Sequence, residues 1–200
     1  PGKKLDTAIR FIEELAARYP IFYGNGNHEQ RMKLYPEKYG DMALKYAEGL
    51  EQAGVTPLVN AGRRIAESNI TVCGVEIGRE YYKRFKAPDM DEEYLNELLG
   101  KAGQEDFIVL LAHNPDYFKT YAEWGADLVL SGHVHGGMVR IPGWKGIVSP
   151  RVRLFPKYDG GIFTTGNSTM ILSRGLGMHT IPIRLFNPAE IVVVDLEGEM

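Results

Sequence analysis

The chain has 200 residues, of which 44% are hydrophobic and 24% are charged, as is ordinary for a globular domain with one sizeable core. The net charge of −3 argues against a broad basic surface, so nucleic acid binding through general phosphate attraction is not expected. The single cysteine, Cys73, excludes an internal disulfide. Its apolar neighbours predict a buried side chain rather than a nucleophile.

The N-terminal part of the chain alternates between helical and strand patterns. Apolar residues spaced three and four apart predict an amphipathic helix over residues 5–19, which Pro20 ends. A short buried strand at 21–23 runs into a polar loop at 24–29. A second helix is predicted over 37–53, with Gly54 as its stop. This rhythm is typical of a layered α/β fold.

The middle of the chain carries short strands and one more helix. Strands are expected at 57–60, 63–66 and 70–76, so close together that they predict hairpins at a mixed sheet edge. Residues 80–88 are predicted to form a loop. A helix is expected over 90–102, with Asp89 or Asp91 as its N-cap.

The C-terminal half begins with two continuous apolar runs, which predict strands covered on both faces. These are residues 107–112, which end at His113, and residues 127–130, which end before His133; a short helix is expected between them at 116–124. Residues 142–158 are predicted to form a long loop. Three closing strands are expected near 161–165, 170–173 and 191–196, and the chain is interpreted as one domain over 1–200.

Metal-ligand residue types follow three of the predicted strands, and four of the five histidines are among them. They are Asn27 and His28, then His113, then His133 and His135. In layered α/β folds, sites gather outside the carboxyl ends of strands. Imidazole suits zinc, manganese or iron, and an amide oxygen suits a harder ion. The combination predicts a metal site.

Each of these residues has a plainer interpretation when taken alone. His113 before Asn-Pro and Asn27 after a glycine are both typical of turns, and His179 is interpreted as a loop or structural residue. Their common position after buried strands favours the metal site. His133 and His135 are two residues apart, so in an extended segment their side chains would point the same way. Each could then serve one of two neighbouring ions.

The ordered set of motifs resembles the last three signatures of the calcineurin-like metallophosphoesterases. These motifs are Gly26-Asn27-His28-Glu29, then His113, then Gly132-His133-Val134-His135. The family pattern begins with Asp-x-His and then Gly-Asp-x-x-Asp, and neither occurs before residue 26. The resemblance implies an α/β fold, a layered sandwich of mixed β-sheets flanked by helices. The first βα units would be missing, lying upstream, so residues 1–200 would be the C-terminal portion of a single domain.

The same resemblance implies a role for each motif residue. Asn27, His113 and His133 would hold one divalent ion and His135 would hold a second, the metals being manganese, iron or zinc. His28 would act as general acid or electrostatic stabiliser. Glu29 would orient a ligand or cap the following helix. The remaining ligands would lie upstream, so this chain by itself is expected to be a half-equipped site that binds metal weakly and is poor at catalysis.

The closing stretches 173–177, 181–184 and 187–191 resemble the small bacterial branch of this family, in which some members are membrane-associated and some cleave the pyrophosphate of a UDP-linked lipid sugar. Met138 departs from that branch, which often has glutamine there. The implied partner is a small phosphorylated substrate, with a nucleotide-linked lipid as one candidate, and no nucleic acid. The implied location is cytoplasmic, or peripheral at the membrane through a missing N-terminal segment.

The implied activity is hydrolysis of a phosphomonoester, phosphodiester or pyrophosphate by in-line attack of a metal-bridging hydroxide. One alternative is a non-catalytic protein-binding scaffold of the same fold. A nucleic acid exonuclease would need a basic groove, which the acid balance does not favour. Residues 81–85 are interpreted as a substrate-facing flap or a solvated loop. The same two interpretations apply to Trp144 with Arg151 or Arg153.

Overall fold

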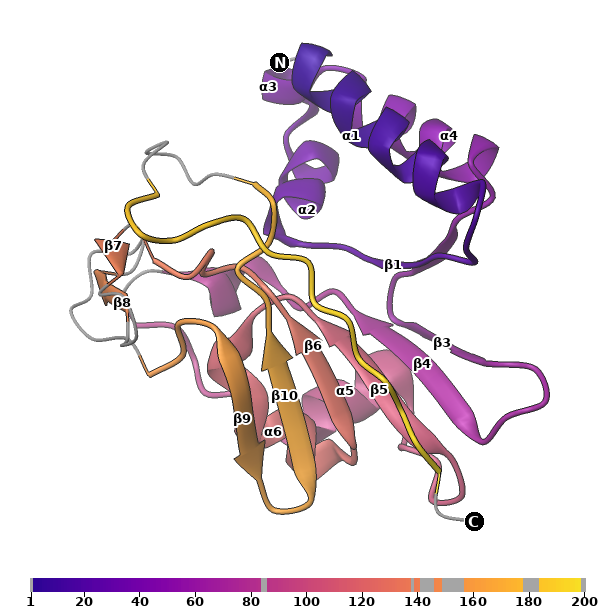
Figure 1. The fold of residues 1–200 in the computed structure, drawn as a ribbon, viewed down its shortest axis with the longest axis vertical. Coiled ribbons are helices and arrows are strands. Elements are labelled where there is room, and N and C mark those ends of the chain that lie inside the picture. The colour runs from indigo at the N-terminus through magenta and orange to yellow at the C-terminus, as the bar shows by residue number, and fades with distance from the viewer. Residues whose placement is uncertain are drawn as a thin grey trace.

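The computed structural model describes residues 2–83, 86–137, 139–140, 146–148, 157–177 and 184–198. Its described part is built in layers (Figure 1). Two helices cover a small two-stranded sheet, this sheet packs on a six-stranded sheet, and two further helices cover the opposite face of the larger sheet. The α/β sandwich of mixed sheets flanked by helices is therefore confirmed.

The larger sheet has the strand order β3-β4-β5-β6-β10-β9. Its strands are β3 (Ala61–Arg64), β4 (Ile70–Val75), β5 (Phe107–Ala112), β6 (Leu128–Ser131), β10 (Ser168–Leu172) and β9 (Gly161–Thr165). The four inner strands run parallel, and the two edge strands pair antiparallel to them. The carboxyl ends of β5 and β6, where two of the predicted ligand segments begin, therefore lie at the same edge.

The smaller sheet pairs β1 (Phe22–Gly24) in parallel with β2 (Thr56–Leu58). It packs on the larger sheet through Phe22 and Leu58, which join a core cluster with Val72 and Val109. The approach is close at Gly74, where a Cβ would lie 2.3 Å from the carbonyl oxygen of Leu58. A side chain at that position would push the sheets apart.

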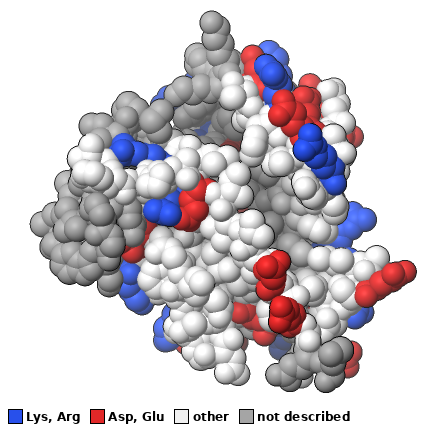
Figure 2. Space-filling model, in the orientation of Figure 1, with Lys and Arg blue, Asp and Glu red and all other residues white. Residues whose placement is uncertain are grey.

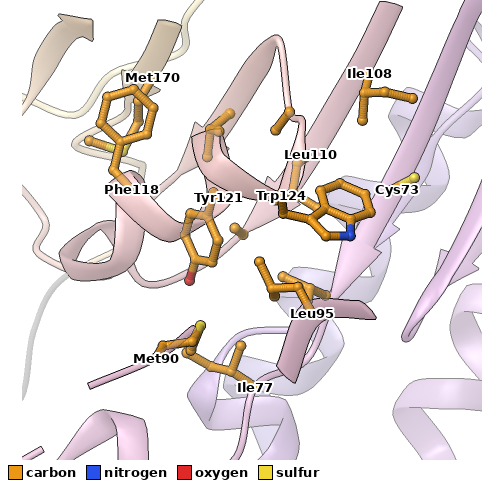
Figure 3. Packing of buried hydrophobic residues seen from close by; sticks show 14 of the residues in the cluster. Cys73, Ile77, Met90, Leu95, Ile108, Leu110, Phe118, Tyr121, Trp124 and Met170 are labelled. Atoms are coloured by element: carbon orange, nitrogen blue, oxygen red, sulfur yellow. The ribbon is translucent and has the colours of Figure 1, made fainter. Parts of the chain in front are cut away.

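The helices α5 (Glu92–Leu99) and α6 (Phe118–Trp124) cover the outer face of the larger sheet. The core between them includes Leu95, Leu110 and Tyr121, each of which is fully buried (Figure 3). Cys73 belongs to this core, which confirms the predicted burial of its side chain, and burial raises the pKa of its thiol. Asp91, rather than Asp89, is the N-cap of α5.

The helices α1 (Gly2–Ala16) and α4 (Met42–Gln52) cover the smaller sheet. The predicted single helix over 37–53 is wrong in its first part. Residues 36–39 form a separate turn of helix, α3 (Pro36–Tyr39), which ends at Gly40 with φ 59° and ψ −131°. No helix continues through that conformation. The eight-residue α2 (Asn27–Leu34) precedes it and begins at the predicted ligand Asn27.

Two loop predictions and one helix prediction need amendment. The predicted loop at 80–88 begins with a 3₁₀ turn, η1 (Arg79–Tyr82), and the predicted helix at 116–124 opens with another, η2 (Pro115–Tyr117). Most of the predicted loop at 142–158 lies outside the described residues. Its described part includes β8 (Gly146–Val148), which pairs antiparallel with β7 (Val139–Arg140).

The predicted strand at 191–196 is also wrong, because this segment pairs with no strand among the described residues. Val193 is 83% exposed and Ile191 is 71% exposed. Strand-forming side chains need a neighbouring strand to complete a ladder, and in the described part this segment is hydrogen-bonded to none as a strand.

The face drawn in Figure 2 carries few charges over the middle of the sheet. In the described residues, no helix has the length and apolar character needed to cross a bilayer.

Candidate metal centre

The predicted ligand segments meet at one edge of the sandwich. Oδ1 of Asn27, in the first residue of α2, lies 3.1 Å from Nε2 of His113, just past the end of β5. The loop after β6 joins them, because the backbone N–H of Gly132 donates to the carbonyl of His113 at 3.3 Å. The side chains of Asn27 and His113 are therefore in contact, and the loop after β6 is hydrogen-bonded to the backbone of His113.

His113 is held in its neutral form. Burial, together with the neighbouring charges of His135 and His28, lowers its pKa from 6.5 to about 4. These electrostatic effects also show that all three imidazoles share one region. A neutral imidazole is the form that coordinates a metal ion, so His113 needs no deprotonation at neutral pH.

His133 lies beside His113, with the two ring centroids 5.1 Å apart in an edge-to-face arrangement. Tyr82 of η1 packs against both rings, at 5.3 Å from His133 and 6.3 Å from His113. Tyr82 therefore forms one wall of the histidine cluster. Tyr82 belongs to the flap predicted at 81–85, of which Tyr81 and Lys83 are also described and Arg84 and Phe85 are not.

The segment that carries His133 and His135 is not extended, so the premise that their side chains point the same way does not hold. Both residues have left-handed backbone conformations, with φ 69° and 49°, which non-glycine residues adopt at a cost. Such strain is typical of functional sites that their surroundings hold in place. The loop between β6 and residue 137 is therefore a tight turn, with positive φ angles at His133 and at residues 135–137.

Asn187 holds this turn from outside. Its side-chain amide donates to the carbonyl oxygens of His135 and Gly137, at 2.7 and 2.8 Å. Only 2% of Asn187 is exposed. Gly136 lies between the two acceptors at φ 70°, and a Cβ there would lie 2.6 Å from Oδ1 of Asn187. Glycine is thus the residue that fits both the conformation and the space.

A charged pair supports the same turn. Nε of Arg174 donates to Oε2 of Glu190 at 2.6 Å, and the guanidinium makes a second contact with the same carboxylate. The side chain of Arg174 would also contact a Cβ at Gly136, at 2.7 Å. Residues from the closing stretches that resemble the small bacterial branch therefore support the turn that carries His133 and His135.

His28 and Glu29 follow Asn27 in the first turn of α2. His28 is exposed to solvent. Oε2 of Glu29 accepts the backbone N–H of Gly26 at 2.8 Å, which caps the start of the helix and fixes the position of Asn27. Of the two roles predicted for Glu29, the capping role is the one that this contact confirms.

The described residues bring together only part of the predicted ligand set. Among them, no three side chains of His, Cys, Asp and Glu are arranged to hold a metal ion. The donors Asn27 and His113 converge, and the neutral imidazole and amide oxygen suit a divalent ion. A cavity of about 280 Å³ lies between the ends of β1, β5 and β6, and His113 lines it. The assignment of Asn27, His113, His133 and His135 as ligands stays a prediction, as does the role of His28.

Sequence reasoning did not identify two residues that position this site, Asn114 and Asn187. Asn114 is fully buried, and its amide donates to the carbonyl of Tyr81 at 3.0 Å, which fixes η1 over the histidines. The Asn-Pro pair after His113 was a usable signal, because asparagine often bonds to nearby backbone. Several residues named from the sequence lie outside the described residues: Met138, Trp144, Arg151, Arg153 and His179.

Comparison with known protein families identifies the family of the chain. The profile of the family described as calcineurin-like phosphoesterase matches residues 2–137. The chain belongs to this family. The matched residues include all three segments of the candidate metal centre.

Curated relatives agree with this assignment. The chain is 30% identical over 199 residues to a metallophosphoesterase of Helicobacter pylori, covering 97% of this chain and 47% of that protein. It is 28% identical over 150 residues to the metallophosphoesterase YkuE of Bacillus subtilis, covering 68% and 52%. It is 28% identical over 186 residues to the phosphodiesterase YaeI of Escherichia coli, covering 92% and 61%.

The chain therefore spans about half the length of the first two of these relatives. No solved structure matches it significantly.

Proposed function

We propose that the protein hydrolyses a small phosphorylated substrate, a phosphomonoester, phosphodiester or pyrophosphate, with two divalent metal ions bound at the edge where Asn27 and the histidines meet. The observation that carries this proposal is the 3.1 Å contact between Asn27 and His113. The two residues come from distant motifs, and their oxygen and nitrogen atoms converge as two ligands of one ion would.

The donors that this chain would offer to metal are Asn27, His113 and His133 for one ion and His135 for the other. Bound divalent ions would lower the pKa of a water molecule and neutralise charge on the phosphoryl oxygens. The low pKa of His113 supports its part, because the imidazole is neutral and ready to coordinate at neutral pH. Asn187 and Gly136 would keep His135 in place through the turn that they stabilise.

The role proposed for His28 follows from its exposure. It lies one residue after the ligand Asn27, yet its side chain faces solvent. A solvent-facing imidazole beside the metal ligands could donate a proton to a leaving-group oxygen, or stabilise charge on the phosphoryl group. Helix α2, capped by Glu29, fixes the relation between ligand and acid.

Further ligands would have to come from outside the described set, since these residues alone provide only a partial shell. The cavity between the ends of β1, β5 and β6 leaves room for side chains to reach His113. The relatives named above are longer than this chain, which is compatible with additional ligand segments.

The test is an activity screen, with manganese, of the protein with its complete set of metal ligands, against one phosphomonoester, one phosphodiester and one pyrophosphate. We expect hydrolysis of at least one class, abolished by a chelator and restored by manganese. A protein that binds manganese but hydrolyses none of the three classes would contradict the proposal and favour the scaffold alternative.

A further inference from the structure

A second cavity, of about 290 Å³, adjoins the candidate metal centre on the side of α2 and η1. Its lining residues are Asn27, Gln30, Arg31, Arg79, Tyr82 and Lys83. Two of these residues also contact the histidines of the candidate metal centre: Asn27 contacts His113, and Tyr82 packs against His133. A ligand bound in this cavity would therefore lie next to the candidate metal centre.

The cavity is positively charged. Arg31, Arg79 and Lys83 line it, and none of the three forms an ion pair with a carboxylate in the part of the chain that the structure describes. Arg79 stacks on the ring of Tyr35, with its guanidinium carbon 4.6 Å from the ring centroid, which fixes the side chain without neutralising it. Three cations around one cavity, in a protein with a net charge of −3, suit an anionic ligand.

A buried amide provides an independent observation. Gln30 also lines the cavity and is only 8% exposed. Its Nε2 donates to the carbonyl of Ile77 at 2.9 Å, but its buried Oε1 has no hydrogen-bond partner. A buried acceptor without a donor is costly, and a ligand with a hydroxyl or N–H group would satisfy it.

We propose that this cavity, the Arg31–Arg79–Lys83 subsite, binds a second phosphate group that the substrate carries on the part released from the metal centre. Guanidinium groups suit phosphate oxygens, and Arg79 is already held in place to receive one. Gln30 would accept a hydrogen bond from a hydroxyl or N–H next to that phosphate. The inference rests on the proposed function and narrows its substrate class to esters with two phosphate groups.

The first test measures binding alone. Titration of inorganic phosphate into the metal-free protein with a chelator present, followed by amide chemical shifts, is expected to move the signals of Gln30, Arg31 and Arg79. Arg31→Gln and Lys83→Gln should each weaken binding about tenfold, as expected for the loss of a charge-assisted contact. Both residues are exposed, so both variants should fold.

Arg10→Gln, an exposed position on α1, is the control of equal charge change and should leave phosphate binding unchanged. Equal weakening in Arg10→Gln and Arg31→Gln would reduce the effect to net charge and overturn the subsite. Shifts confined to the histidine cluster would overturn it as well.

The second test separates the subsite from the activity. In the manganese-loaded protein, Arg31→Gln should raise KM about tenfold for a substrate with two phosphate groups and leave KM for p-nitrophenyl phosphate unchanged. If phosphate binds in the cavity but neither substrate is hydrolysed, the proposed function fails and the anion site stands. If both substrates are hydrolysed with unchanged KM in Arg31→Gln, the subsite fails and the function stands.

Discussion

Nε2 of His113 lies 3.1 Å from Oδ1 of Asn27, although 86 residues separate them in the chain. The contact joins the carboxyl end of a central strand to the first residue of a helix in the neighbouring layer. It therefore depends on correct packing of the two sheets, and the stability of the fold and the geometry of the site should respond to the same changes.

The protonation of His113 should make stability depend on pH. Its pKa is about 4 in the folded protein and near 6.5 when unperturbed, so between these values the unfolded chain binds more protons. Stability should be fully present above about pH 6.5 and should fall by up to about 3 kcal/mol as the pH falls to 4. Urea unfolding of metal-free wild type and His113→Gln at several pH values checks this. Parallel pH profiles in the two proteins would contradict the assignment.

His28 and His133 should separate catalysis from metal binding. His28→Ala should keep normal metal content and lower kcat by about 10²–10⁴-fold, the usual contribution of a general acid. His133→Ala should lose metal together with activity. Metal analysis and turnover measured on the same preparations provide both readouts. Normal metal content and turnover in His133→Ala would overturn the ligand assignment.

Substitution of Gly136 should disturb the turn that carries His133 and His135. In Gly136→Ala the new Cβ would meet Asn187 at 2.6 Å and Arg174 at 2.7 Å, in addition to the strain at φ 70°. We expect a loss of about 2–4 kcal/mol in the free energy of unfolding, together with weaker metal binding.

Gly175→Ala is the matched control for that change. Its φ is 63°, and nothing lies within 4 Å of the added Cβ, so only the backbone strain of about 1 kcal/mol should be felt. Equal destabilisation of the two variants, measured by urea unfolding, would show that contact with Asn187 and Arg174 adds nothing.

The N-cap of α5 allows a test away from the site. Oδ1 of Asp91 accepts the backbone N–H of Tyr94 at 3.0 Å, so Asp91→Ala should destabilise the fold by about 1 kcal/mol. Asp89→Ala, two residues earlier and exposed, should change the free energy of unfolding by less than about 0.5 kcal/mol. Thermal unfolding of both variants distinguishes them, and a larger effect at Asp89 would refute the cap.

Local sequence patterns predicted the strands that position the candidate site. The apolar run of β5 ends at His113, and that of β6 ends just before the turn with His133, as the continuous hydrophobic pattern indicated. Because parallel strands place their carboxyl ends at one edge, the clustering of ligand types could also be foreseen. The family motifs then supplied the roles.

Other features depend on contacts that no local pattern reveals. The side chain of Asn187 reaches the carbonyl of His135 across 52 residues of sequence, and the left-handed backbone of the histidine turn follows from such tertiary restraints. The break at Gly40 interrupts an otherwise regular helical pattern. The segment 191–196 has strand composition, but a strand forms only beside a partner.

The left-handed backbone at His133 and His135 also has a consequence for protein engineering. A search for stabilising substitutions would select both positions for replacement by glycine, because a left-handed backbone costs a non-glycine residue about 1–2 kcal/mol. Each replacement would remove a proposed ligand. Libraries designed to raise the melting temperature should therefore keep these two positions fixed, since the most heat-resistant variants there would lack a side chain that is proposed to bind metal.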